Sequence, residues 1–298
     1  MRLVTRGDLD GLTCAVLISS CEKIDEVVLI HPQDITDQRF KVGGEDILAN
    51  LPFASGCAKW FDHHLLTDNN DFPRENFEGR YALAPSAARV VFDYYVATHP
   101  ELRKHERLVA ETDRLDAAQL TMDDVLDPKD YILVGLTLDP RTGLGSWKDY
   151  FLLLAEALRT RSIADVLALP EVQERASRLK AQDQAFRAAT LAHSRLEGNV
   201  VFTDFRGVEP LPIGNRFIVY TLFPAANISL RVHWGPNRQG VVAAVGHSIF
   251  NRTSHTTVGI LMSKYGGGGH KGAGTCLLPA EGADAKIAEI LAQLKKDG

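Results

Sequence analysis

The chain has 298 residues, of which 45% are hydrophobic and 24% are charged, and its formal net charge is −5. These values predict a soluble globular protein with two domains, and the negative charge argues against a broad binding surface for long duplex DNA. The four cysteines show no CxxC spacing, which excludes zinc-ribbon and thioredoxin-type sites. No signal peptide precedes the first expected strand and no apolar run reaches about 20 residues, so we expect a cytoplasmic protein that does not enter the membrane.

The N-terminal residues predict a strand followed by a helix, with two aspartates between them. Residues 2–5 read as the strand, and an apolar helix is expected from about Gly11. Asp8 and Asp10 then lie at the carboxyl edge of a strand, where open α/β sheets bind their ligands. One carboxylate could simply cap the helix. Two at positions i and i+2 favour a metal site.

Two further strands are predicted over residues 27–31 and 46–51. His31 is the last residue of the first of these, and Asp34 follows it. We expect both side chains to end a loop rather than to reach the ligand crevice. Asn50 follows the apolar part of the second strand, just before a proline that ends it. An amide at this strand end could face the same crevice as the aspartates.

A fourth predicted strand, residues 57–61, leads directly into Asp62, His63 and His64. Neutral imidazole and carboxylate together suit divalent cations such as Mn²⁺, Fe²⁺ or Zn²⁺. The alternative is a polar strand end in which one histidine caps a neighbouring loop. The two further polar constellations, one near each end of the chain, favour the metal interpretation.

The middle of the chain is predicted to be largely helical. Residues 85–95 open with a Pro-Ser start signal and continue as an amphipathic helix. Asp113 and Asp116 fall at a helix end or in the loop after it, and Asp113 is the better ligand candidate because it directly follows an apolar stretch. Residues 148–197 show helical periodicity. Strands that alternate with helices in this way predict a mostly parallel sheet.

After residue 198 the composition changes to short β-type segments, at residues 200–202, 217–220, 227–232, 241–245 and 276–278. A closing helix is expected from about Gly282. This texture predicts a second, smaller domain of mixed α/β structure.

Four consecutive glycines precede a histidine in this second region. Such a run costs conformational entropy unless the backbone must approach something closely, and its exposed N–H groups can form an anion-binding nest. A flexible hairpin turn is the alternative. With Lys271 and two arginines in the same domain, we expect a phosphate-bearing ligand. The candidate substrate-binding residues here are Arg231, Arg252, Gly267, Gly268, Gly269 and His270.

These motifs together resemble the DHH/DHHA1 phosphoesterase family. The matching segments, in chain order, are Asp8-Leu9-Asp10-Gly11, Asp62-His63-His64, Asp113 and Gly266 to His270. The family includes RecJ-type exonucleases, nano-RNA and pAp phosphatases, cyclic dinucleotide phosphodiesterases and exopolyphosphatase-like proteins. The resemblance implies an α/β DHH domain with a mostly parallel sheet and helical linker over residues 1–185. It further implies a smaller mixed α/β DHHA1 domain over residues 197–298, whose glycine loop faces the metal site.

The resemblance also implies a metal-dependent hydrolysis of a phosphoester or phosphoanhydride bond at the cleft between the domains. Family members usually hold two Mn²⁺ ions, which activate water and neutralise phosphate charge. Asp10, His63 and Asp113 would bind one ion, and Asp8 would belong to the other. His64 would contact the phosphoryl group, and Asp62 would orient its neighbours.

Two positions depart from the family pattern. Arg6 stands where the first motif normally has a histidine, and a guanidinium has no lone pair for a metal. Asn50 stands at the strand end where the second motif normally supplies a bridging aspartate. We therefore expect one tight site for Mn²⁺ or a similar divalent cation.

Three interpretations remain open. In the first, Arg6 replaces the missing cation as a phosphate clamp in an active phosphoesterase. In the second, the protein binds a nucleotide or polyphosphate without hydrolysing it. In the third, Asp34 or Asp46 supplies the missing carboxylate. The expected substrates are short single-stranded oligonucleotides, pAp or polyphosphate; a homodimer is compatible with the sequence, although no residue indicates one.

Overall fold

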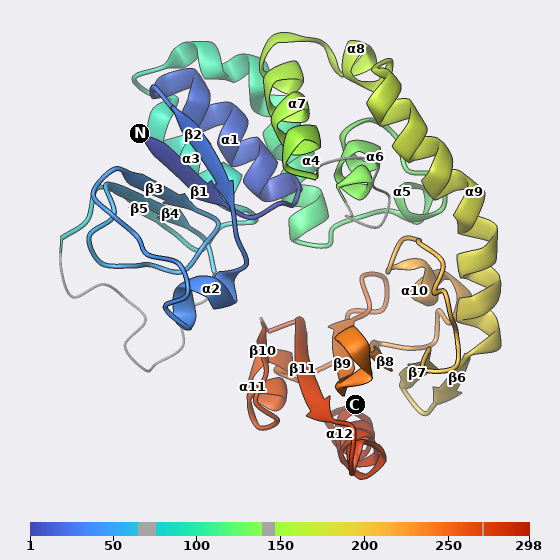
Figure 1. Ribbon diagram of the computed structural model, residues 1–298. Coiled ribbons are helices and arrows are strands. Elements are labelled where there is room, and N and C mark those ends of the chain that lie inside the picture. Colours follow the sequence, from blue (N-terminus) through green and yellow to red (C-terminus); the bar gives the residue numbers. More distant parts are fainter. Residues whose placement is uncertain (65–75, 139–146, 270) are drawn as a thin grey trace. The chain divides into compact units, whose positions relative to one another are not determined.

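The protein is described here from a computed structural model. The structure describes residues 1–64, 76–138, 147–269 and 271–298. The chain divides into two compact units, the first formed by residues 1–120 and 127–178 and the second by residues 121–126 and 179–298. Each unit is built around its own β-sheet (Figure 1).

In the first unit, the strands of the described residues form a sheet in the order β2-β1-β3-β4-β5, with every neighbouring pair parallel. The strands are β1 (Arg2–Thr5), β2 (Glu26–Leu29), β3 (Asp46–Ala49), β4 (Lys59–Asp62) and β5 (Gly79–Tyr81). The predicted parallel sheet is therefore confirmed. β3 ends earlier than predicted because Asn50 adopts a φ of 58°, outside the β region.

Both faces of this sheet are buried, as expected for parallel strands. Leu3, Ile47 and Phe61 point to the face that is covered by helices. Val4 and Trp60 point to the opposite face, where they pack against loop residues. The helices of this unit are α1 (Leu9–Cys21), α2 (Pro32–Thr36), α3 (Ala87–Tyr95), α4 (Glu106–Asp116), α6 (Asp130–Thr137), α7 (Trp147–Thr160) and α8 (Ile163–Leu167).

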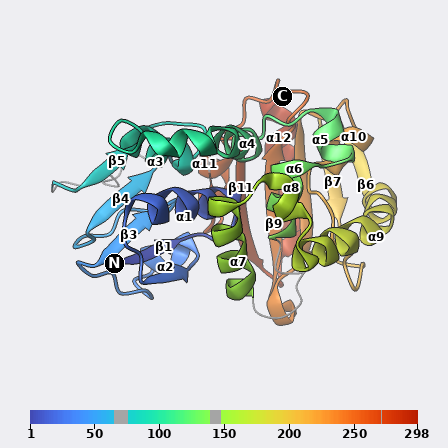
Figure 2. The ribbon, with the colours of Figure 1, turned by 90° about the horizontal axis from the view of Figure 1, so that it is seen from above.

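Helix α1 lies at the centre of the helical layer, in contact with α3, α4 and α7 (Figures 1 and 2). It begins at Leu9, slightly earlier than predicted, because Asp8 is its N-cap. The Oδ1 atom of Asp8 accepts a hydrogen bond from the backbone N–H of Gly11 at 2.9 Å. This start places Asp10 in the first turn of the helix rather than in the preceding loop.

Helix α2 explains the two polar residues that follow β2. His31 is the N-cap of this helix, and the Asp34 carboxylate accepts a hydrogen bond from the His31 backbone N–H at 2.9 Å. Both side chains therefore end a loop, as expected from the sequence.

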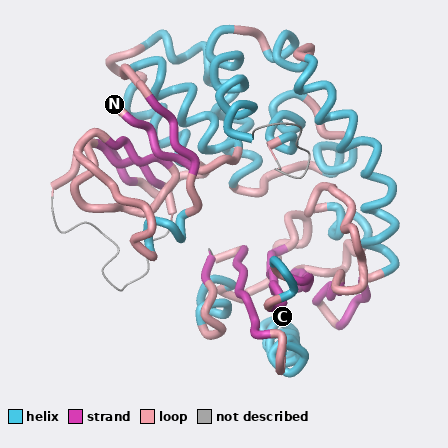
Figure 3. Tube along the Cα trace, in the orientation of Figure 1, coloured by secondary structure: helices cyan, strands magenta, loops and turns pink. Residues whose placement is uncertain are grey.

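The second unit holds a mixed sheet in the order β10-β11-β9-β8-β7-β6, in which only the β7–β8 pair is parallel among the described residues. Its strands are β6 (Ser194–Glu197), β7 (Val200–Asp204), β8 (Ile228–Trp234), β9 (Gly240–His247), β10 (Gly268–Gly269) and β11 (Ala273–Pro279). Helices α11 (Val258–Ser263) and α12 (Ala283–Asp297) pack on this sheet (Figure 3). The predicted mixed α/β texture is confirmed.

One predicted strand of the second unit is wrong. Residues 217–220 lie at the start of α10 (Ile218–Leu222) instead. The Asn215 side chain accepts a hydrogen bond from the backbone N–H of Phe217 at 3.0 Å, which turns the chain into a helix. A short apolar run does not distinguish a buried helix from a strand by periodicity.

The remaining helices are α5 (Met122–Leu126), which belongs to the second unit, and α9 (Pro170–Ala192), which contributes residues to both units. Pro170 is the first residue of α9, so the segment predicted to be helical is divided between α9 and the helices before it. Among the helices of the described residues, none is long and apolar enough to cross a membrane.

His105, at the end of a 3-10 helix over Pro100–His105, makes stability depend on pH. Burial, with Lys104 and Arg159 nearby, lowers its pKa to about 4 from an ordinary value of 6.5. The unfolded chain therefore binds the proton more tightly, and stability falls as the pH drops from about 6.5 towards about 4, by up to roughly 3 kcal/mol. Urea unfolding across this range should show a shallower pH dependence for His105→Gln; equal slopes in both proteins would contradict this.

Candidate metal centre

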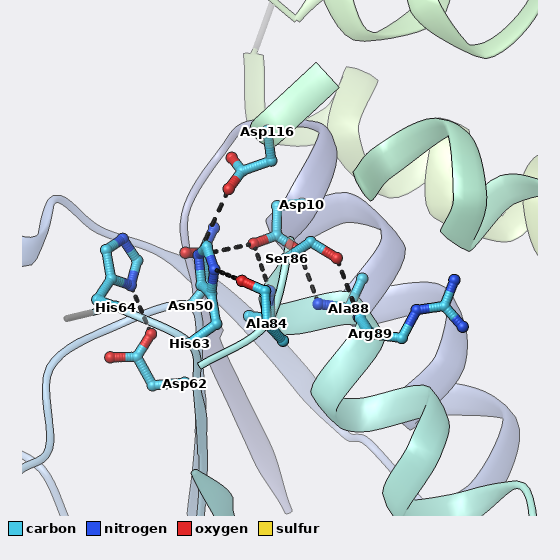
Figure 4. A network of polar contacts seen from close by, with 12 residues as sticks. Asp10, Asn50, Asp62, His63, His64, Ala84, Ser86, Ala88, Arg89 and Asp116 are labelled. Carbon is cyan, nitrogen blue, oxygen red and sulfur yellow. Dashed lines mark hydrogen bonds and ion pairs between the residues drawn. The ribbon is translucent and has the colours of Figure 1, made fainter. Parts of the chain in front are cut away.

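Three side chains from distant parts of the first unit converge at the carboxyl edge of its sheet. Asp10 comes from the first turn of α1, His63 directly follows β4, and Asp116 ends α4. The Nε2 atom of His63 lies 3.6 Å from Oδ2 of Asp10 and 3.4 Å from Oδ2 of Asp116 (Figure 4). These potential ligand atoms all lie within 4.8 Å of one another, which suits a single metal ion.

The orientation of the His63 ring leaves its Nε2 atom available to bind a metal ion. Its Nδ1 atom lies 3.0 Å from the carbonyl oxygen of Ala84, which can only accept a hydrogen bond. Nδ1 therefore carries the hydrogen, and the neutral ring keeps its lone pair on Nε2. This Nε2 atom is buried and has no hydrogen-bond partner among the described residues. A ring nitrogen fixed in this way between two carboxylates fits a divalent cation.

Asp10 is held by the N-terminus of α3. Its Oδ2 atom accepts a hydrogen bond from the backbone N–H of Ala87 at 2.9 Å, and its Oδ1 atom accepts one from Ala88 at 2.7 Å. Burial raises the pKa of this carboxyl group well above its usual value, the charges of Asp116 and Asp8 raise it further, and the two amide bonds oppose the rise. A bound cation would favour the ionised form.

Asp116 shares this electrostatic environment but is closer to water. Burial raises its pKa, a positive charge on the neighbouring His63 would lower it, and the charge of Asp8 raises it again. About a third of the side chain, 32%, remains exposed, so solvent limits the rise. We therefore expect Asp116 to ionise at a lower pH than the fully enclosed Asp10.

The structure places Asp116 at the cluster in the position predicted for Asp113. Asp113 accepts hydrogen bonds from Ser86 Oγ at 2.6 Å and from the Nε and Nη2 atoms of Arg89 at 2.9 and 2.7 Å. The Asp113 carboxylate thus links α4 to α3. Asp116 takes the place of Asp113 among the candidate metal ligands. The sequence pattern does not distinguish Asp116 from Asp113, because both aspartates fit the same helix end.

Asp62 and His64 form a second pair beside this cluster. The Nδ1 atom of His64 lies 2.6 Å from Oδ1 of Asp62, which is buried at the end of β4. The backbone carbonyl of His64 accepts a hydrogen bond from Tyr81 Oη at 2.9 Å. Asp62 therefore holds the His64 ring at its Nδ1 atom, and the role of this pair in the reaction stays a prediction. These two residues and His63 also lie within 4.8 Å of one another, but the Asp62 contact already engages His64 Nδ1.

Asp8, which was expected to bind a second ion, is engaged by protein groups at both oxygens. Besides the Gly11 N–H, its Oδ1 atom accepts a hydrogen bond from Asn50 Nδ2 at 3.1 Å. Its Oδ2 atom lies 3.1 Å from Arg6 Nε. The predicted metal role of Asp8 therefore does not agree with its contacts.

Neither Asp34 nor Asp46 supplies the missing carboxylate. Asp34 caps its own helix, as described above. Asp46 stands at the opposite end of β3 from Asn50, where it accepts hydrogen bonds from Arg2 Nε and Nη2 at 2.6 and 2.8 Å and from the Gly43 N–H at 2.8 Å. The third interpretation of the sequence is thus wrong for both residues.

The glycine run of the second unit is partly a strand rather than an open loop. Gly268 pairs with Thr275 and Gly269 pairs with Gly274. A Cβ atom on Gly267 would lie 2.0 Å from the Thr275 carbonyl oxygen, so close packing requires a glycine there. His270 lies outside the described residues.

The two arginines predicted to bind substrate also belong to the second unit. Arg231 lies in β8, where it pairs with Ala244 of β9 and Thr203 of β7. Arg252 donates a hydrogen bond from Nε to the Ile249 carbonyl oxygen at 3.0 Å. Their role in substrate binding stays a prediction.

A solved structure of a phosphoesterase identifies the class and the family of this protein. The chain is similar to the pGpG-specific phosphodiesterase PggH from Vibrio cholerae, with 38% sequence identity, a TM-score of 0.80, and coverage of 100% of this chain and 99% of that chain. The chain belongs to the DHH/DHHA1 phosphoesterase family. No protein-family model and no curated protein sequence matches it.

Two more distant structures share the fold. RecJ from Thermus thermophilus in complex with Mn²⁺ has 16% identity and a TM-score of 0.56, covering 99% of this chain and 52% of that chain. The DHH domain of a member of a family of ribosomal proteins has 14% identity and a TM-score of 0.55, covering 98% of this chain and 85% of that chain.

Proposed function

We propose that the protein is a divalent-cation-dependent phosphodiesterase that hydrolyses short 5′-phosphorylated oligonucleotides such as pGpG. The observation that carries this proposal is the buried Nε2 atom of His63, placed between the carboxylates of Asp10 and Asp116. A buried polar atom without a partner is costly, and a cation would satisfy it together with both carboxylates. The full-length similarity to a pGpG-specific phosphodiesterase supports the choice of substrate.

We further propose that the ion is Mn²⁺ and that one ion binds tightly. When bound, it supplies Lewis-acid activation of water and neutralises charge on the phosphoryl group. The protein's own groups fix the geometry: the α3 amides hold Asp10, and the Ala84 carbonyl sets the tautomer of His63. Asp62 orients His64, which we assign to the contact with the phosphoryl group.

The second unit is proposed to bind the nucleotide or phosphate end of the substrate. The candidates there are Arg231, Arg252, Gly267, Gly268, Gly269 and His270. Of these, the arginines suit phosphate oxygens because of their planar fork of donors. Substituting either arginine by alanine and measuring KM for pGpG tests this role.

A hydrolysis panel tests the proposed activity. Protein stripped with a chelator and resupplied with Mn²⁺ is given pGpG, pAp or polyphosphate, and the products are separated by chromatography. We expect hydrolysis of pGpG to two molecules of GMP, lost on chelation and restored by Mn²⁺. Binding of pGpG that is recovered intact would instead indicate a nucleotide-binding protein. Faster turnover of pAp or polyphosphate would reassign the substrate.

A further inference from the structure

Asp8, two residues before Asp10, forms a second polar group with Arg6 and Asn50. Asp8 joins the other two, with Oδ2 3.1 Å from Arg6 Nε and Oδ1 3.1 Å from Asn50 Nδ2. With the Gly11 N–H also bound at Oδ1, protein donors approach both oxygens of this carboxylate. A metal ion at Asp8 would have to displace the guanidinium.

Asn50 cannot supply the charge that a second ion needs. Its side chain is fully buried, and the contact with the Asp8 carboxylate, an acceptor, fixes the amide so that nitrogen faces Asp8. The Oδ1 atom then points elsewhere and has no hydrogen-bond partner among the described residues. An amide oxygen is a neutral ligand, so it cannot hold two cations close together.

The two carboxylates of the metal cluster balance the charge of one divalent cation. Ionised Asp10 and Asp116 carry two negative charges, and neutral His63 adds a lone pair without charge. Asp8 and Arg6 cancel one another at 3.1 Å. One divalent ion at this cluster therefore neutralises Asp10 and Asp116, and the neighbouring Asp8 carboxylate is already paired with Arg6.

Arg6 itself is suited to a ligand. Its guanidinium always carries its charge and has five N–H donors, and its Nε atom lies 3.1 Å from Oδ2 of Asp8. The side chain is 32% exposed, so it is accessible to a solute. No hydrogen bond from its two terminal nitrogens to a described residue accompanies this ion pair, and two such nitrogens match the spacing of phosphate oxygens.

We propose that Arg6 is a built-in cation that takes the place of a second metal ion and binds the non-bridging oxygens of the scissile phosphate. Asp8 and Asn50 position it there. The assignment of the phosphate rests on the proposed function, whereas the exclusion of a second ion does not depend on it.

The first experiment counts ions, with Mn²⁺ alone as the probe. Chelator-treated protein is titrated by calorimetry, and bound manganese is counted by elemental mass spectrometry after gel filtration. We expect one tight ion for the wild type and two for Arg6→His combined with Asn50→Asp, which adds an imidazole lone pair and a carboxylate. Arg2→His is the matched control, because Arg2 pairs with Asp46 at the other end of the sheet, and it should bind one ion.

Two tight ions in the wild type would overturn the proposal. So would a double variant that folds, as judged by circular dichroism, and still binds only one ion. The phosphate contact is tested separately with Arg6→Ala, which should keep one Mn²⁺ but lower kcat/KM for pGpG by roughly 100-fold. Unchanged kcat/KM would refute the contact. If the wild type hydrolyses nothing, the proposed function fails while the ion count still decides the role of Arg6.

Discussion

His63→Ala should abolish tight Mn²⁺ binding and lower the hydrolysis of pGpG by about 1,000-fold or more. The substitution removes the Nε2 lone pair that lies between Asp10 and Asp116. Even outer-shell partners of metal ligands are worth about 10–100-fold in affinity, so loss of a ligand should exceed that. Calorimetry with Mn²⁺ measures the first effect, and initial rates measure the second.

The neighbouring histidine provides the matched control. His64→Ala removes a ring that Asp62 orients, but it leaves the Asp10, His63 and Asp116 cluster intact. We expect this variant to keep its Mn²⁺ affinity while kcat falls by about 100-fold. Loss of metal in His64→Ala, or metal retained in His63→Ala, would show that the roles of the two rings are reversed.

Asp116→Asn should weaken metal binding and Asp113→Asn should lower stability, although the two residues are only one helical turn apart. Asp116→Asn removes a charged ligand and should weaken Mn²⁺ binding by about 100-fold or more with little change in stability. Asp113→Asn leaves the cluster in place but breaks the ion pair with Arg89, whose side chain is only 25% exposed. We expect it to lower the free energy of unfolding by about 2 kcal/mol.

Two measurements decide whether Asp116 or Asp113 is the metal ligand. Urea denaturation of both variants gives the stability effects, and Mn²⁺ titration of the folded proteins gives the affinities. If Asp113→Asn lost the metal while Asp116→Asn kept it, the assignment from sequence would be restored and the observed cluster would not be the binding site.

The strand framework of the first unit was predictable because its signals are local. β1, β3 and β4 are short apolar runs, and each is followed by a polar residue at its carboxyl end. In a parallel sheet these ends meet at one edge, so Asp10, Asn50 and His63 could be expected near one another. The resemblance of the motifs to a known family then supplied the chemistry.

The parts that were not predictable depend on contacts between distant segments. Asp113 and Asp116 lie on nearly the same face of α4, and the contacts of Ser86 and Arg89 with Asp113 show which carboxylate is already engaged. The amides of Ala87 and Ala88 that hold Asp10 follow a recognised helix start signal, but nothing local identifies their partner, which lies 77 residues from Ala87 in the sequence.

The competing assignments of Asp8 show a similar limit. An aspartate at this position can be either a helix cap or a metal ligand. The sequence pattern alone favours the metal ligand. The hydrogen bond to Gly11 and the pairing with Arg6 assign Asp8 to the cap and to positioning. The deciding neighbour, Asn50, lies 42 residues away in the sequence.

A metal centre formed by Asp10, His63 and Asp116 is tested most directly by anomalous diffraction at the manganese edge from crystals grown with Mn²⁺. We expect one strong peak within coordination distance of His63 Nε2 and both carboxylates. A strongest peak elsewhere, such as beside Asp113, would contradict this assignment.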